Sequence, residues 1–239
     1  MTQTDRAAFF VEEPVAVGAQ VALSIADAQH IAVLRLGAGE RVGLRDGVGG
    51  SASGTLVRLG RKNALVEVDQ AVAVPPSKAI HLLVPVADRD RMLWLAEKAA
   101  ELNVTSWRPV LWQRSRSVSP RGDGPTFRNK VRSRMIAALL QSRSAWLPEI
   151  FPEATIERAV AAAPEGGRVV LEAAGLPFGA IELKEPVVIA VGPEGGFEEA
   201  ELAELIAAGF TAVSIGESIL RFETAAIAGV AVALSMLRS

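Results

Sequence analysis

The chain has 239 residues, enough for one or two domains, and half of them are hydrophobic while 22% are charged, as in ordinary globular proteins. Cysteine is absent, which excludes disulfides and thiolate zinc sites, and the polar start Met1–Thr4 lacks the layout of a signal peptide, so we expect a cytoplasmic protein. The longest apolar run, Thr224–Leu237, is shorter than the roughly 20 residues of a membrane helix, so we expect no membrane partner.

The first seventy or so residues have the pattern of a small β-barrel. Short alternating or apolar stretches, separated by glycine turns, predict strands at Arg41–Asp46, Ser53–Leu59 and Asn63–Val68. The run Gly47–Gly50 superficially resembles a dinucleotide fingerprint, but a strand pattern follows it, which indicates a hairpin turn. Because Pro75 and Pro76 end the pattern, we interpret Gln70–Ser77 as a linker and expect domains at 1–74 and 75–239.

After the linker the chain alternates between strand and helix patterns. Apolar runs predict strands at Ala79–Val84, Val104–Val110, Arg168–Glu172, Pro186–Val191 and Thr211–Ile215. Helical spacing of apolar residues predicts helices at Arg89–Leu102, Thr126–Leu140, Glu198–Ala208 and Phe222–Leu237. This alternation predicts an α/β domain with a mainly parallel sheet and helices on its faces.

Basic residues gather in the middle of the chain although the net charge is −2. From Arg108 to Arg143, eight arginines and one lysine occur with a single acid, Asp123. Arginine grips phosphates bidentately and stacks on bases, so this segment is a candidate RNA surface; the alternative is a solvated helix face with an arginine-rich coding bias. We assign RNA binding to Arg35, Arg114, Arg116, Arg128, Arg132 and Arg143, and stacking on RNA is a further option for Trp112 and Trp146.

Two glycine turns follow predicted strands in the last fifty residues. The strand that ends at Val191 runs into Gly192-Pro193-Glu194-Gly195-Gly196, and the strand that ends at Ile215 runs into Gly216. Glutamates at the following helix start, and the absence of a phosphate-loop motif, favour a neutral or cationic ligand such as adenosine with a sulfonium. The alternative is a plain strand-to-helix turn. His30 and His81 are the only histidines, so we expect no metal site.

These motifs resemble the ribosomal RNA small subunit methyltransferase E family, the uracil-N3 methyltransferases of the SPOUT superfamily. The resemblance rests on Gly192–Phe197, Ile215-Gly216, Ile219-Leu220-Arg221 and Glu223-Thr224-Ala225, with Phe9-Phe10, Lys98, Glu101-Leu102, Arg114-Ser115, Gln141-Ser142 and Pro148-Glu149-Ile150 elsewhere. The family's usual residues are replaced at Asp88, Leu140, Ser144–Trp146 and Glu217-Ser218, where a glycine of the family also becomes Arg143.

The resemblance implies an amino-terminal PUA-like β-barrel that helps to bind RNA and a carboxyl-terminal SPOUT domain with a trefoil-knotted chain. It also implies a homodimer and S-adenosylmethionine as the cofactor. The expected cofactor-binding residues are Leu171, Glu172, Ala173, Val191, Gly192, Pro193, Glu194, Gly195, Gly196, Ile215, Gly216, Ile219, Leu220 and Thr224.

The implied reaction is methylation of N3 of a uridine in 16S ribosomal RNA. Arg221 is the candidate that stabilises the developing uracil anion, and its alternative role is an ion pair with Glu223 or Glu194. Glu194 and Gln141 are candidates for orienting the base or the cofactor. Two other functions stay open: a SPOUT methyltransferase for another RNA base or target, and a non-catalytic RNA-binding homologue.

Overall fold

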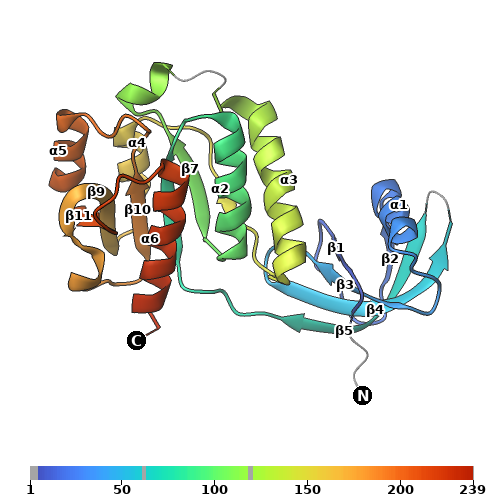
Figure 1. The fold of residues 1–239 in the computed structure, drawn as a ribbon. Coiled ribbons are helices and arrows are strands. Elements are labelled where there is room, and N and C mark those ends of the chain that lie inside the picture. Colours follow the sequence, from blue (N-terminus) through green and yellow to red (C-terminus); the bar gives the residue numbers. More distant parts are fainter. Residues whose placement is uncertain (1–4, 61–62, 118–120, 239) are drawn as a thin grey trace. The chain divides into compact units, whose positions relative to one another are not determined.

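The computed structural model describes residues 5–60, 63–117 and 121–238. The chain divides into two compact units (Figure 1). The first comprises Met1–Pro76 together with Leu139–Leu147, and the second comprises Ser77–Ala138 and Pro148–Ser239. Among the described residues, no helix is long and apolar enough to span a membrane.

The first unit is built on a five-stranded mixed sheet with one helix. Its strands lie in the order β1-β3-β4-β5-β2, and only the β1–β3 pair is parallel. The elements are β1 (Ala8–Phe10), β2 (Gln20–Leu23), α1 (Ile25–Val33), β3 (Arg41–Arg45), β4 (Gly50–Leu59) and β5 (Ala64–Ala73). Phe9, Ile31 of α1 and Leu56 meet in one buried cluster. The antiparallel β3–β4 pair confirms the predicted hairpin turn at Gly47–Gly50.

Two expectations for this unit were wrong. Helix α1 has no counterpart in the predicted strand pattern; Ser24 caps it by accepting a hydrogen bond from the Asp27 amide at 3.1 Å. The interpretation of Gln70–Ser77 as linker fails over its first half, because β5 pairs with β4 as far as Ala73. Hydrophobic and polar residues alternate only weakly between Gln70 and Ala73, so the sequence pattern of a strand is hard to recognise beside the two prolines.

The segment Leu139–Leu147 belongs to the first unit although it follows the second unit's residues in sequence. The Gly49 amide donates to the Ala145 carbonyl at 2.9 Å, and the Leu147 amide donates to the Gly47 carbonyl at 2.8 Å. The Trp146 indole donates to the Val74 carbonyl at 3.0 Å. A Cβ on Gly49 would lie 2.6 Å from the Trp146 ring, so this close packing requires glycine there.

The second unit contains a six-stranded sheet in which every pair is parallel, in the order β11-β9-β10-β6-β7-β8. Its strands are β6 (Ile80–Pro85), β7 (Ser106–Val110), β8 (Glu149–Ile150), β9 (Gly167–Pro177), β10 (Val187–Val191) and β11 (Thr211–Ser214). Its helices are α2 (Arg89–Glu101), α4 (Ile156–Ala161), α5 (Glu199–Ala207), α6 (Phe222–Met236) and, as far as Ala138, α3 (Gly124–Ser142), with 3-10 turns η1 (Gln113–Ser117) and η2 (Phe178–Ala180). The predicted parallel α/β architecture is confirmed.

Helices cover both faces of the central strand β10, every residue of which is buried (Figure 1). Helix α6 packs on the face of Ile189, and α2 packs against α6. Val188 and Ala190 point to the opposite face, where they cluster with Ala159 of α4 and Leu205 of α5. The sheet is therefore the middle of three layers, and its carboxyl ends open on one edge.

Candidate cofactor site

A cavity of about 160 Å³ lies at the carboxyl ends of β10 and β11, beside Leu171–Ala173 in the middle of β9. Twelve of the fourteen residues that we expected to bind the cofactor line it: Leu171, Glu172, Ala173, Val191, Gly192, Pro193, Glu194, Gly196, Ile215, Gly216, Ile219 and Leu220. Gly195 and Thr224 are not among the lining residues, whereas Phe197, Val213, Ser214, Ser218, Phe222 and Ala225 line the cavity without having been predicted. Because parallel strands end at one edge, their loops converge although they lie far apart in sequence.

The turn after β10 is shaped by two glycines. Gly196 has φ +73°, a left-handed conformation that glycine adopts without steric cost. A Cβ on Gly192 would lie 3.0 Å from the Phe197 ring, so only glycine lets the chain pass this side chain without a shift. Phe197 in turn meets fully buried Trp112 edge-to-face, with 4.9 Å between the ring centroids. The option that Trp112 stacks on RNA is therefore wrong.

Arg114 holds the same turn from the other side. Its Nε donates to Glu198 Oε1 at 2.8 Å, and its Nη1 donates to the Gly195 carbonyl. Glu198 is the residue before α5, and its amide donates to Glu201 Oε2 at 2.9 Å. The other oxygen of Glu201 accepts from the Gln113 amide at 2.7 Å, which ties η1 to the start of α5. Arg114 was predicted to bind RNA; the structure gives it this loop-holding position.

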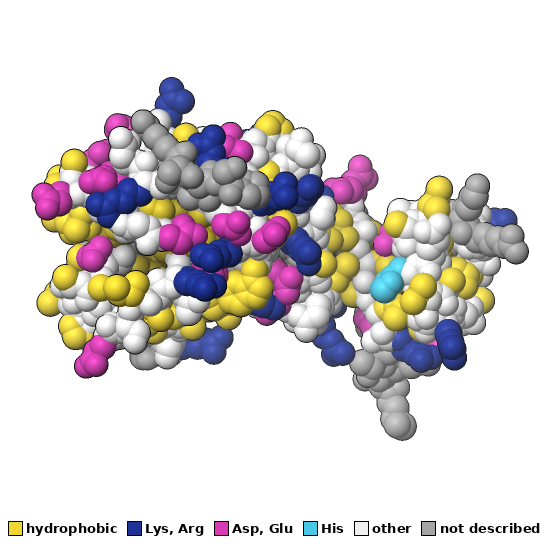
Figure 2. All heavy atoms as spheres, turned by 45° about the horizontal axis from the view of Figure 1, so that its top comes forward, with side chains coloured by type: hydrophobic (Ala, Val, Ile, Leu, Met, Phe, Trp, Pro, Cys, Tyr) yellow, Lys and Arg dark blue, Asp and Glu magenta, His cyan; other side chains and the backbone are white. Residues whose placement is uncertain are grey.

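Acidic side chains are the charged groups at the cavity. Glu172 and Glu194 line it, and among the described residues no basic side chain does. Arg91 Nη1 pairs with Glu194 Oε1 at 3.2 Å. Glu223, in the first turn of α6, is buried, and among the described residues its Oε2 has no hydrogen-bond partner. Figure 2 shows hydrophobic side chains in a hollow of this unit with charged side chains around it. Such a surface favours a ligand that is largely apolar and carries positive charge.

The three candidate catalytic residues occupy different environments. Glu194 lines the cavity. Arg221 is exposed at the N-cap of α6, between the lining residues Leu220 and Phe222, and in the described part of the chain it forms no ion pair with Glu223 or Glu194. The alternative role of Arg221 as an ion-pair partner is therefore wrong. Gln141 is exposed in the first unit and is not part of the cavity.

The other arginines expected to bind RNA are distributed over both units. Arg35 and Arg143 belong to the first unit and are exposed, with left-handed φ values of 57° and 61°. Arg128 and Arg132 are half-buried on α3, in its second-unit part. The side chain of Arg116 lies outside the described residues.

Comparison with known proteins assigns both parts of the chain. A profile described as RNA methyltransferase domain matches residues 75–234, and one described as RNA methyltransferase PUA domain matches residues 26–69. The chain is 29% identical to the ribosomal RNA small subunit methyltransferase E of Mycobacterium bovis, covering 91% of this chain and 87% of that protein. It is 27% identical to the enzyme of the same name from Rickettsia conorii, over 83% of this chain and 82% of that one.

Solved structures agree with the sequence relatives. A ribosomal RNA small subunit methyltransferase E from Neisseria gonorrhoeae, bound to S-adenosylmethionine, matches with a TM-score of 0.86 at 29% identity over 97% of both chains. A Legionella pneumophila protein in complex with S-adenosylmethionine matches with a TM-score of 0.84 at 25% identity over 98% of both. The second unit thus has the SPOUT α/β-knot fold, and the first contains a PUA domain. The chain belongs to the ribosomal RNA small subunit methyltransferase E family.

Proposed function

We propose that this protein transfers the methyl group of S-adenosylmethionine to N3 of a uridine in the 16S ribosomal RNA of the small subunit. The observation that carries the proposal is the cavity at the ends of β10 and β11 and beside the middle of β9, whose charged lining residues are glutamates. A carboxylate near a sulfonium favours binding of that cation, and the apolar lining suits a nucleoside. Support comes from the relatives, two of which hold S-adenosylmethionine.

The residues at the cavity would hold the cofactor through both backbone and side chains. Backbone groups of Gly192, Gly196 and Gly216 can approach a ligand closely, because these residues carry no Cβ. Glu172 and Glu194 would offset the positive charge of the sulfonium. Leu171 and Leu220 would cover its apolar parts. We also keep Gly195 and Thr224 as proposed cofactor contacts, on the family resemblance alone.

Methylation forms the N3–CH3 bond while the S–CH3 bond breaks, and the N3 proton leaves before or during this attack. The enzyme must hold the two reacting centres in line and must stabilise the negative charge that develops on uracil. Arg221 is the proposed stabiliser, because it is exposed between two cavity-lining residues and pairs with neither nearby glutamate. Gln141 stays a proposal without structural support, and Glu194 is proposed to orient the cofactor.

The proposal extends to organisation. Residues 1–74 would act as the RNA-binding domain and 75–239 as the methyltransferase domain, with arginines of both contacting ribosomal RNA in the cytoplasm. Assembly as a homodimer is supported by exposed apolar side chains beside the cavity, since Ile219 is 93% exposed and Leu220 is 38% exposed.

The test uses small-subunit ribosomal RNA from cells that lack the protein. Incubation with S-adenosylmethionine should produce one methylated uridine fragment, detected by mass mapping, and calorimetry should show cofactor binding without RNA. Arg221→Ala should lower turnover with unchanged cofactor affinity, while Arg158→Ala, an exposed arginine on α4, should leave both unchanged. No methylated fragment would overturn the proposed reaction, and full turnover of Arg221→Ala would exclude its role.

A further inference from the structure

A second cavity lies in the first unit, whereas the cofactor site belongs to the second. Its volume is about 220 Å³, and its lining residues are Asp5, Arg6, Ala7, Ala8, Arg45, Leu140 and Arg143. All seven belong to the first unit, because Leu140 and Arg143 come from the segment that joins it. One water takes about 30 Å³ of liquid volume, so the cavity has room for a tetrahedral anion with several waters.

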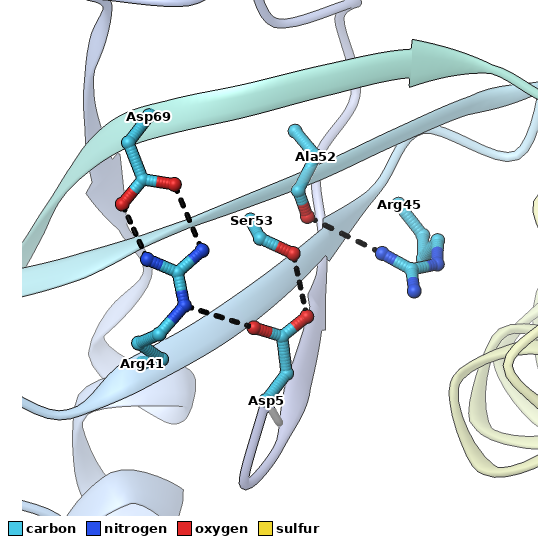
Figure 3. Close-up of polar contacts among 6 residues, drawn as sticks. All are labelled: Asp5, Arg41, Arg45, Ala52, Ser53 and Asp69. Carbon is cyan, nitrogen blue, oxygen red and sulfur yellow. Dashed lines mark hydrogen bonds and ion pairs between the residues drawn. The ribbon is translucent and has the colours of Figure 1, made fainter. Parts of the chain in front are cut away.

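Arg45 is one of the three arginines that line this cavity. Its Nη1 donates to the Leu44 carbonyl at 2.8 Å and to the Ala52 carbonyl at 3.3 Å, and Figure 3 shows the latter bond. Its Nε is buried and has no hydrogen-bond partner among the described residues. A charged donor that is buried and unpaired costs free energy, so an added acceptor would be stabilising.

The carboxylate of this cavity is already engaged elsewhere. Asp5 Oδ2 accepts from Ser53 Oγ at 2.6 Å, and Asp5 Oδ1 lies 3.9 Å from Arg41 Nε (Figure 3). Arg41 itself forms a two-pronged ion pair with Asp69. Within the described residues, no carboxylate lies at ion-pair distance from Arg45. Arg41 therefore has ion-pair partners, whereas Arg45 has none among the described residues.

Arg143 adds a second positive charge, at a backbone position that disfavours it. It has φ 61°, just after the end of α3, where glycine is the usual residue. A side chain in this conformation costs about 1–2 kcal/mol. Burial lowers the pKa of Arg45, and Asp5 partly offsets this effect. The positive charge of Arg143 lowers the pKa of Arg45 further, because the two arginines repel each other. An anion between the two arginines would relieve this repulsion, which offsets part of the backbone strain at Arg143.

Arg6 also lines the cavity, but its Nη1 pairs with Glu40. Among the described residues, the cavity's arginines without an ion pair are therefore Arg45 and Arg143. Arginine binds phosphate bidentately through parallel N–H donors.

We propose that Arg45 and Arg143 bind one backbone phosphate of the ribosomal RNA in this cavity. The proposal rests on the proposed function for the identity of the polyanion. It adds one defined contact to the proposed function: a single phosphate is bound in the first unit by Arg45 of β3 and by Arg143 of the segment Leu139–Leu147. Such a contact fixes the position of the RNA without reading its sequence.

The test measures binding of an end-labelled transcript of small-subunit ribosomal RNA as a function of salt. Arg45→Met and Arg143→Gly should each weaken binding about tenfold and reduce the slope of log K against log salt by about one. The double variant should lose less than the product of the single losses, because both arginines grip the same phosphate. Arg58→Met, which removes an exposed charge from β4, is the matched control and should keep the slope.

Folding and ligand source are controlled in the same series. Arg143→Gly should raise Tm while weakening RNA binding, because glycine adopts φ 61° without strain. Unchanged slopes for Arg45→Met and Arg143→Gly would overturn the site. The site would also be overturned if Arg45→Met abolished the calorimetric heat of inorganic phosphate binding but left the affinity for RNA unchanged. If the slopes change but no uridine is methylated, the phosphate site stands and the proposed reaction fails.

Discussion

Substitution of Gly192 by alanine tests whether close packing in the turn after β10 excludes a side chain at this position. The new Cβ would lie 3.0, 3.1 and 3.2 Å from three atoms of the Phe197 ring. Phe197 is 9% exposed and cannot move aside easily, because it rests edge-on against fully buried Trp112. Overpacking of this kind costs about 1–3 kcal/mol, and each kcal/mol lowers Tm by about 2–4 °C in a protein of this size.

Thermal unfolding without cofactor should therefore show a Tm lower by roughly 2–12 °C for Gly192→Ala. The matched control is Gly216→Ala in the same cavity, where a Cβ would meet no described atom within 4 Å. Its Tm should stay constant or rise slightly, because alanine reduces the entropy of the unfolded chain. The double variant Gly192→Ala/Phe197→Leu should be more stable than the sum of the single effects predicts. Equal losses for Gly192→Ala and Gly216→Ala would refute the packing argument.

Two further predictions concern the second unit. Arg114→Met should change Tm little, since exposed ion pairs contribute about 0–1 kcal/mol to stability. Calorimetry should nevertheless show weaker S-adenosylmethionine binding, because the turn at Gly195 loses its hydrogen bond to this arginine. Arg121→Met, which removes another exposed ion pair, should bind the cofactor normally, and equal affinities of the two variants would contradict the role of Arg114. Burial lowers the pKa of His81 from its ordinary value of 6.5, only partly offset by Glu149, so the unfolded chain binds a proton that the native chain resists. Stability should then fall as pH drops below about 6.5, and a Tm series over pH should show a flatter slope for His81→Gln; identical slopes would exclude this histidine as the source.

The sequence predicts the second unit well because its strands are buried on both faces. Val187–Val191 is apolar at every position and runs into a glycine turn, a pattern that is typical of a buried strand in a parallel sheet. Helix α1 was missed because it is short and its capping residue Ser24 stands in a region dominated by strand patterns. A serine followed three residues later by Asp27 was the available signal.

The candidate site was predictable where residues follow a strand and not where they meet through packing. Phe197 is not among the predicted cofactor-binding residues, yet it lines the cavity and contacts Trp112 from a distant segment. The position of Arg114 against Gly195 depends on the loop after β7, which periodicity does not place. Ser214 and Ala225 line the cavity because β11 and α6 converge, and only the fold shows this.

The membership of Leu139–Leu147 in the first unit has a consequence for synthesis. A ribosome that has released residues 1–76 has not yet made Trp146, which packs on Gly49 and bonds to the Val74 carbonyl. The amino-terminal unit therefore cannot complete its native contacts during translation until a large part of the second unit has also emerged. A nascent chain stalled before residue 139 would expose the turn at Gly47 and Gly49 to proteases, and one stalled after 147 would protect it.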